Sequence, residues 1–414
     1  MGVAAGTAAA TDATMPETKI LLASERIRGV LAPVVTPFKA DLAPDRQRFI
    51  THCRWLLSQN CGLAPFGTTS EANSLSTDER ISLLDALVAA GIDPSRMMSG
   101  TGCCSITETV ALTAHAVKHG CAGVLMLPPF YYKDVSEEAL YRYFSEVVQR
   151  VSDACLRIYL YHIPPVAVVG ITPELVERLL KAYPSAIAGM KDSSGDWNNT
   201  KTFLDAFSVR TRHERSSKSQ TPSSKSQGSS KIQPSKGEGT FGSRRGGDFD
   251  SQTSFDVFVG SESFLLANMR DGGAGTISAT ANVNPAAIDA LYQSAKTQAP
   301  NPRHQEKSKH QTPEQHRTGA LQPGHENESN IEHQTSKMER QQADLDVVRE
   351  VFSSRKFPSI IAAVKQAIAI YANDPEWARV RPPLVELTTE QANLLAAELK
   401  RIGFAIGGKL GVDC

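Results

Sequence analysis

Short apolar runs alternate with amphipathic stretches from residue 29 to residue 207. The first run extends from Val30 to Val35, and residues 45–59 then place Phe49, Cys53 and Leu56 at helical spacing. A short apolar run bounded by turn residues is typical of a buried strand, whereas apolar residues three or four apart predict one face of a helix. The pattern repeats, with strands predicted at 62–66, 96–100, 123–127, 157–161 and 185–190 and helices starting at Thr77, Thr107, Ser136 and Thr172. Such alternation predicts a parallel sheet covered by helices.

Two polar tracts interrupt this pattern. Residues 208–254 are Ser, Lys, Arg, Gln and Gly with almost no aliphatic side chains, and residues 297–343 are rich in Gln, His, Glu and Lys. A segment that cannot bury enough apolar surface does not offset its loss of chain entropy, so both tracts are predicted to be disordered. Between them, strands are predicted at 255–259 and 275–278, each followed by a helix.

Helical spacing returns near residue 344 and continues in helices predicted at 359–371 and 389–402. Eight strand–helix units predict an α/β fold, a (β/α)8 TIM barrel over residues 29–296 that is interrupted at 208–254, with a C-terminal helical extension at 344–414. Residues 1–28 contain acidic side chains and no apolar signal-peptide core, so a disordered leader is expected. The insertion at 208–254 joins a helix to the next strand and is therefore expected at the end of the barrel opposite the catalytic loops.

The charge balance limits which partners are expected, and the cysteine content indicates the redox state of the compartment. Lys+Arg and Asp+Glu both number 44, so there is no overall bias toward nucleic acid or an anionic membrane. No apolar run approaches the ~20 residues of a membrane span. Seven cysteines without metal-type spacing indicate free thiols in a reducing compartment. We expect a cytoplasmic protein, with an organellar address as the alternative, and neither a metal nor another cofactor.

Lys191 is the strongest candidate for chemistry. It follows the apolar run from Ala186 to Met190, and so lies where a buried strand ends and a loop begins. We expect the ammonium to lose hydration there, which disfavours its charged form. A neutral amine can attack a ketone and form a Schiff base.

Other reactive residue types follow the predicted strands, and the reacting groups of such barrels come from those strand ends. The segments are Gly67-Thr68-Thr69-Ser70-Glu71, Pro129-Phe130-Tyr131-Tyr132-Lys133, Tyr161-His162-Ile163-Pro164, Lys191-Asp192-Ser193 and Gly260-Ser261-Glu262. In this order they resemble the pyruvate-dependent class I aldolases of the dihydrodipicolinate synthase and N-acetylneuraminate lyase superfamily. The resemblance extends over residues 29–207 and 255–295.

The resemblance implies a role for each of the catalytic candidates. Lys191 would be the Schiff-base nucleophile and Tyr161 would relay protons during bond cleavage. Tyr132 matches a tyrosine that reaches across a subunit contact to complete the relay, and Tyr131 is the weaker match. A homodimer or homotetramer is therefore expected.

The same resemblance implies a substrate site for pyruvate or another small 2-keto acid. Thr68 and Thr69 would bind its carboxylate through N–H groups and a hydroxyl. Gly260 and Ile277 match positions that shape the pocket. Ser193 and Glu262 are candidates to hydrogen-bond hydroxyl groups of the substrate.

The identity of the aldehyde half stays open at this point. Synthases of the lysine precursor have a carboxylate-binding arginine two residues after the Tyr-x-x-Pro motif, where this chain has Val166, and Ala279 replaces a serine of the sialate-type lyases. The remaining candidates are aldolases for 2-keto-3-deoxy sugar acids or 4-hydroxy-2-oxoglutarate, and hydratase-aldolases with apolar substrates. The apolar residues from Val166 to Val169 favour a substrate with a compact or partly apolar tail.

The predicted function is a Schiff-base lyase that releases pyruvate. Alternatives are 4-hydroxy-tetrahydrodipicolinate synthase and a non-catalytic barrel that recruits partners through its basic insertion.

Overall fold

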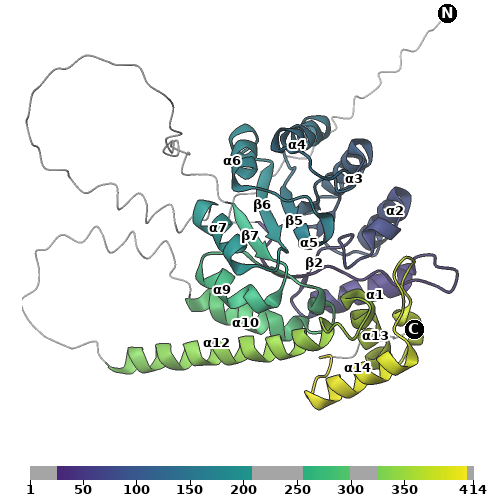
Figure 1. Cartoon of the computed structure of the whole chain (residues 1–414), viewed down its shortest axis with the longest axis vertical. Helices are drawn as coiled ribbons and strands as arrows, with labels where there is room; N and C mark the ends of the chain where they lie inside the picture. The colour runs from purple at the N-terminus through teal and green to yellow at the C-terminus, as the bar shows by residue number, and fades with distance from the viewer. Residues whose placement is uncertain (1–25, 208–254, 299–324, 408–414) are drawn as a thin grey trace, which may run out of the picture.

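The computed structural model describes residues 26–207, 255–298 and 325–407 (Figure 1). The predicted insertion at 208–254 and all but the last three residues of the predicted leader lie outside the described residues. Within the described part, no helix is both long enough and apolar enough to cross a membrane.

Eight parallel strands form the sheet at the centre of the protein. They are β1 (Gly29–Ala32), β2 (Gly62–Leu63), β3 (Met98–Gly100), β4 (Gly123–Met126), β5 (Ile158–His162), β6 (Ile187–Asp192), β7 (Asp256–Val259) and β8 (Gly275–Ile277). The hydrogen-bonded order is β2-β1-β8-β7-β6-β5-β4-β3, and a parallel bridge between Leu63 and Met97 joins the two ends. The predicted (β/α)8 barrel is confirmed.

Helices surround the strands (Figure 1). They are α1 (Arg46–Ser58), α2 (Thr77–Ala89), α3 (Ile106–Lys118), α4 (Glu137–Val151), α6 (Pro173–Ala182), α7 (Trp197–Phe207), α9 (Leu265–Arg270) and α10 (Pro285–Gln298), with the one-turn helix α5 (Pro164–Ala167) after β5. Local capping sets their starts. At α2, the Ser76 hydroxyl accepts from the Glu79 N–H at 3.1 Å while the Glu79 carboxylate accepts from the Ser76 N–H at 2.9 Å.

In the described part, three α-helices follow the barrel: α12 (His325–Phe352), α13 (Ile360–Ala372) and α14 (Thr389–Arg401). The prediction of disorder over 297–343 is wrong for its two ends, because α10 continues to Gln298 and α12 begins at His325. A few contacts dock α12 on the barrel. Met338 is buried, and the Gln342 amide donates to the Glu262 carbonyl and accepts from the Leu266 N–H. The composition of this segment is polar overall, so it did not predict that a few widely spaced residues would pack on the barrel.

The barrel encloses its own layer of apolar side chains, distinct from the larger core between strands and helices. Leu31, Leu125, Tyr159 and Phe258 belong to this inner cluster and are almost fully buried. They fill the barrel below its carboxyl end. The cavity described next therefore has a packed floor.

Candidate active site

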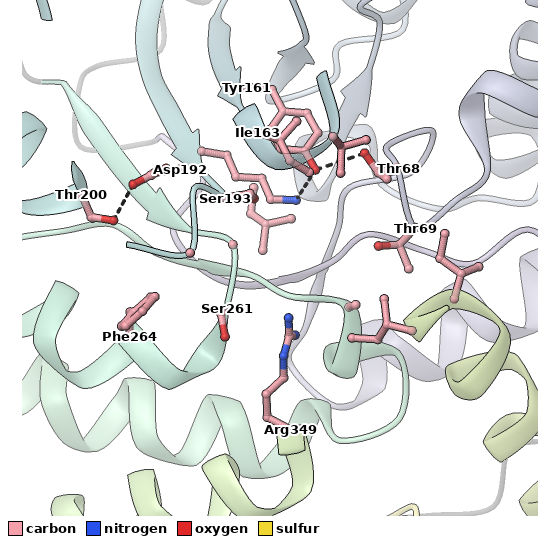
Figure 2. Close-up of a pocket in the computed structure, with 18 residues that line it drawn as sticks. Thr68, Thr69, Tyr161, Ile163, Asp192, Ser193, Thr200, Ser261, Phe264 and Arg349 are labelled. Atoms are coloured by element: carbon pink, nitrogen blue, oxygen red, sulfur yellow. Dashed lines mark hydrogen bonds between the residues drawn. The ribbon is translucent and has the colours of Figure 1, made fainter. Parts of the chain in front are cut away.

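A cavity of about 250 Å³ lies at the carboxyl ends of the strands (Figure 2). Most of the residues predicted from the sequence line it, namely Thr68, Thr69, Tyr161, Lys191, Ser193, Gly260 and Ile277. They come from the ends of five different strands or from the loops that follow. The structure therefore brings these seven candidates together, whereas their roles stay predictions.

Lys191 and Tyr161 are register partners on the neighbouring strands β5 and β6. The Lys191 Nζ lies 3.3 Å from the Tyr161 hydroxyl and 4.4 Å from the centre of the phenol ring. Both side chains are almost fully buried, with 4% and 3% of their surface exposed. A nucleophile and a proton-transfer group are thus held within hydrogen-bond reach in a largely dry site.

The loop after β2 supplies hydrogen-bond donors opposite this pair. The Thr68 hydroxyl lies 3.2 Å from the Tyr161 hydroxyl, which extends the polar chain beyond Lys191 (Figure 2). Within the described part of the chain, the N–H groups of Thr68 and Thr69 have no hydrogen-bond partner. Consecutive free N–H groups of this kind suit an anion.

Ser193 and Gly260 form another wall by close contact. A Cβ added to Gly260 would lie 2.0 Å from the Ser193 Oγ and 2.8 Å from its Cβ. The Gly260 N–H also donates to the Asp192 carbonyl at 2.6 Å, which ties the end of β6 to the loop after β7. The Asp192 carboxylate is already hydrogen-bonded within the protein, because it accepts from the Ser194 N–H and from the hydroxyl of Thr200.

Glu262 does not lie where the sequence analysis expected it. Its carboxylate is buried behind the wall and accepts hydrogen bonds from the hydroxyls of Ser278 and Thr280 and from Arg349 Nη1 at 3.3 Å. Because Glu262 does not line the cavity, the prediction that it binds substrate hydroxyls is not supported. The short helix Glu262–Phe264 turns the side chain away, a local geometry that sequence spacing did not show.

Comparison with known proteins shows what this chain is similar to. The model of the Dihydrodipicolinate synthetase family matches residues 26–210. An uncharacterized DapA-like lyase of Chloroflexus aurantiacus is 36% identical over 182 residues, which are 44% of this chain and 60% of that protein. The crystal structure of dihydrodipicolinate synthase from Agrobacterium tumefaciens superimposes with a TM-score of 0.64 and 27% identity, covering 91% of this chain and 99% of that one. Residues 26–210 are thus similar to the Dihydrodipicolinate synthetase family, and the likeness to a solved dihydrodipicolinate synthase extends over 91% of the chain.

Two further comparisons set the limits of this likeness. The alignment spans less than two thirds of the length of the curated relatives that the chain matches. A 2-keto-3-deoxygluconate aldolase variant of Sulfolobus solfataricus superimposes with a TM-score of 0.63 at 16% identity, covering 91% of this chain and 96% of that one. At this identity the likeness concerns the fold alone.

Tyr132, which the family resemblance assigned to the proton relay, is not brought to the cavity of its own chain. It lies on the loop after β4 with 73% of its surface exposed, in edge-to-face contact with Tyr131, which is 74% exposed. Two adjacent exposed tyrosines form an apolar protrusion on the surface. A relay through Tyr132 therefore needs a second copy of the chain and stays a prediction.

A buried ion pair braces the Thr68–Thr69 loop, and sequence reasoning missed it. Lys365 of α13 is fully buried, and its Nζ lies 2.7 Å from a Glu71 oxygen and 2.8 Å from the Thr36 carbonyl. Burial lowers the pKa of Lys365 to about 8, while the Glu71 carboxylate acts in the opposite direction. A lysine within the apolar stretch Ile360–Ala372 was a signal that could have pointed to this contact.

Arg349 of α12 also lines the cavity, together with Ile360 and Ile361 of α13. Its guanidinium points into the cavity from the side opposite Tyr161 (Figure 2). No role was predicted for this arginine, because nothing in its local pattern shows that α12 packs beside α10 and the short helix Glu262–Phe264.

Possible metal ligands gather elsewhere. Among the described residues, the one group with suitable spacing is Asp85 of α2 with His115 and His119 of α3, whose Nε2 atoms each lie 2.8 Å from the same Asp85 oxygen. None of the three lines the cavity.

Proposed function

We propose that this protein is a Schiff-base-forming class I aldolase that reversibly cleaves a 2-keto acid to pyruvate and an aldehyde. One observation carries the proposal: the Lys191 Nζ lies 3.3 Å from the Tyr161 hydroxyl inside a cavity that also presents free N–H groups. An amine nucleophile, a phenolic acid–base and an anion site are the three parts that this chemistry needs.

In the first stage, the lone pair of Lys191 Nζ attacks the C2 carbonyl carbon of the substrate, whose carboxylate is bound at Thr68 and Thr69. The new C–N bond forms as the carbonyl oxygen takes a proton through Tyr161. The amine nitrogen then returns a proton to the Tyr161 oxygen, which passes it to the new hydroxyl. The hydroxyl leaves as water, and a protonated imine and the Tyr161 phenolate remain.

In the second stage, the protonated imine withdraws electrons from the substrate chain. The hydroxyl on C4 gives its proton to the Tyr161 oxygen, the C3–C4 bond breaks, and its electron pair forms the enamine. The aldehyde departs. Protonation of the enamine at C3 and hydrolysis by water then release pyruvate and regenerate the Lys191 amine.

The substrates that fit best are 2-keto-3-deoxy sugar acids and 4-hydroxy-2-oxoglutarate. Val166, which stands where synthases of the lysine precursor have an arginine, lies at the cavity with 61% of its surface exposed and offers no charge. A cavity of about 250 Å³ admits a small keto acid and little more. These features disfavour 4-hydroxy-tetrahydrodipicolinate synthase activity.

The test is reductive trapping of the Schiff base. The full chain is incubated with pyruvate and borohydride, digested, and analysed by mass spectrometry. One reduced pyruvate is expected on Lys191, none in the Lys191→Met variant, and an unchanged adduct in a control variant at Lys118, which is exposed on α3. Absence of the adduct, or its persistence in the Lys191→Met variant, would overturn the proposal.

A further inference from the structure

Arg349 stands out because the reaction described above does not use it. Its side chain is only partly exposed, at 22%, and its guanidinium projects among apolar cavity walls (Figure 2). An arginine held in such a place loses hydration, so it needs partners that replace the lost water contacts. Those partners indicate what the residue does.

The protein satisfies one edge of the guanidinium. Arg349 Nη1 donates to the Ser278 hydroxyl at 3.0 Å and to the Glu262 carboxylate at 3.3 Å. Glu262 also accepts from the hydroxyls of Ser278 and Thr280, so its negative charge is shared with the loop after β8. The contact orients Arg349 and leaves part of its hydrogen-bonding capacity unused.

The other edge faces the cavity. Over the described residues, Nη2 and Nε of Arg349 have no hydrogen-bond partner. Two parallel N–H groups on one guanidinium edge match the two oxygens of a carboxylate. Around them the cavity lining includes the apolar side chains of Phe264, Ile360 and Ile361 and the hydroxyl-bearing Ser261.

The cavity therefore has hydrogen-bond donors on two sides. Thr68 lies beside Tyr161, with Thr69 next to it along the loop, and Arg349 enters from the side opposite Tyr161 (Figure 2). Lys191 would hold the keto carbon between them. A substrate that uses both sets of donors carries an acidic group on each side of its ketone.

We propose that Arg349 binds a carboxylate at the far end of the substrate and makes the site selective for 2-keto dicarboxylates over 2-keto acids with neutral tails. This inference rests on the proposed function, because Lys191 anchors the keto group. It separates the two substrate classes left open above and favours the 4-hydroxy-2-oxoglutarate type. Arg349 is a specificity-determining residue in this scheme and takes no part in proton transfer.

The experiment compares two ligands that differ only at the far end. 2-Oxoglutarate and 2-oxopentanoate have chains of equal length, ending in a carboxylate and a methyl group, and borohydride trapping on Lys191 reports the half-saturation concentration of each. In the unmodified protein, the half-saturation concentration of 2-oxoglutarate should be lower than that of 2-oxopentanoate by a factor of about 10 or more. This is the effect expected of one charge-assisted pair. In the Arg349→Gln variant the ratio should approach one. Arg340→Gln, an exposed position on the same helix, should keep the original ratio.

Each outcome bears on the proposal. Equal half-saturation concentrations of the two ligands in the unmodified protein would overturn the proposal. This test needs no variant, so it holds even if Arg349→Gln folds poorly. Weaker trapping of both ligands by Arg349→Gln, with an unchanged ratio, would show that Arg349 only supports Glu262. Trapping of pyruvate distinguishes the two levels: no adduct at all removes the aldolase proposal and this inference with it, whereas an adduct without the preference removes the inference alone.

Discussion

Tyr161 and Lys191 occupy paired register positions on adjacent parallel strands, with their functional atoms 3.3 Å apart. Paired residues on neighbouring strands point to the same side of a sheet, and here that side is the barrel interior. The juxtaposition is therefore a property of two rigid strands and does not depend on a loop. A site built on such elements keeps its geometry when the substrate enters.

The phenol of Tyr161 should be essential for turnover. In the Tyr161→Phe variant we expect kcat for pyruvate release to fall about 10²- to 10⁴-fold, the usual contribution of a positioned acid–base group. The control is Tyr159→Phe on the same strand, where the buried hydroxyl has no hydrogen-bond partner among the described residues and is not part of the cavity. Equal kcat values for the two variants would argue against a proton-transfer role for Tyr161.

Tyr132 and Tyr131 allow a test of a shared site, because both are exposed to nearly the same extent in one chain. If a second copy inserts Tyr132 into the cavity, Tyr132→Phe should lower kcat about 10-fold or more, whereas Tyr131→Phe should not. Steady-state kinetics with sedimentation measurements on each variant separate loss of the relay from loss of assembly. A monomer with full activity would exclude the shared relay.

Gly260 has no room for a side chain. In Gly260→Ala, the new Cβ would meet the Oγ, Cβ and Cα of Ser193 at 2.0, 2.8 and 3.0 Å, so Ser193 must move into the cavity. We expect a loss of about 1–3 kcal/mol in the free energy of unfolding, with a lower kcat/KM. Gly170→Ala is the control, because its Cβ would meet only the His162 ring at an ordinary 3.6 Å. Similar urea midpoints for both variants would contradict the steric account.

The Glu71–Lys365 pair should show the asymmetry of buried charges. Lys365→Met leaves the fully buried Glu71 carboxylate without its cation, and we expect it to cost about 3–5 kcal/mol in the free energy of unfolding. The double variant Glu71→Gln/Lys365→Met removes both charges and should recover most of this loss. Lys181→Met, which removes the cation of an exposed pair on α6, should have almost no effect. Urea denaturation of the variants measures the difference.

His52 should make the protein less stable in mild acid. Burial lowers the pKa of His52 to about 4 from an ordinary 6.5, although its hydrogen bond to Asn282 acts in the opposite direction. Between these values the unfolded chain binds the proton and the folded chain does not, so stability falls as the pH drops from about 6.5 to about 4, by up to ~3 kcal/mol.

A variant that cannot titrate isolates this contribution. His52→Gln should have a smaller slope of unfolding free energy against pH in this range, whereas His333→Gln, exposed on α12, should keep the original slope. Parallel pH profiles for His52→Gln and the unmodified protein would show that the buried imidazole is not responsible.

Much of the fold could be predicted from local pattern. Apolar runs such as Ile187–Met190 lie in buried strands, and Ser136 and Thr172 cap the helices that were expected to begin there. Lys191, Tyr161, Thr68 and Thr69 could also be placed, because carboxyl ends of parallel strands converge in a barrel of this kind. The period of the apolar residues and the order of the strands along the chain can be read from the sequence without any knowledge of distant contacts.

The tertiary structure decided what those ends meet. It turned Glu262 away from the cavity toward Ser278 and Thr280, brought Arg349 to the cavity wall, and buried Lys365 against Glu71, far away in the chain. The spacing of apolar residues predicts whether a side chain is buried, and the charge of a side chain indicates which kind of group it could bind. Neither identifies the partner, because a long-range contact depends on how separate helices pack on the barrel, and that packing is determined only when the whole chain folds.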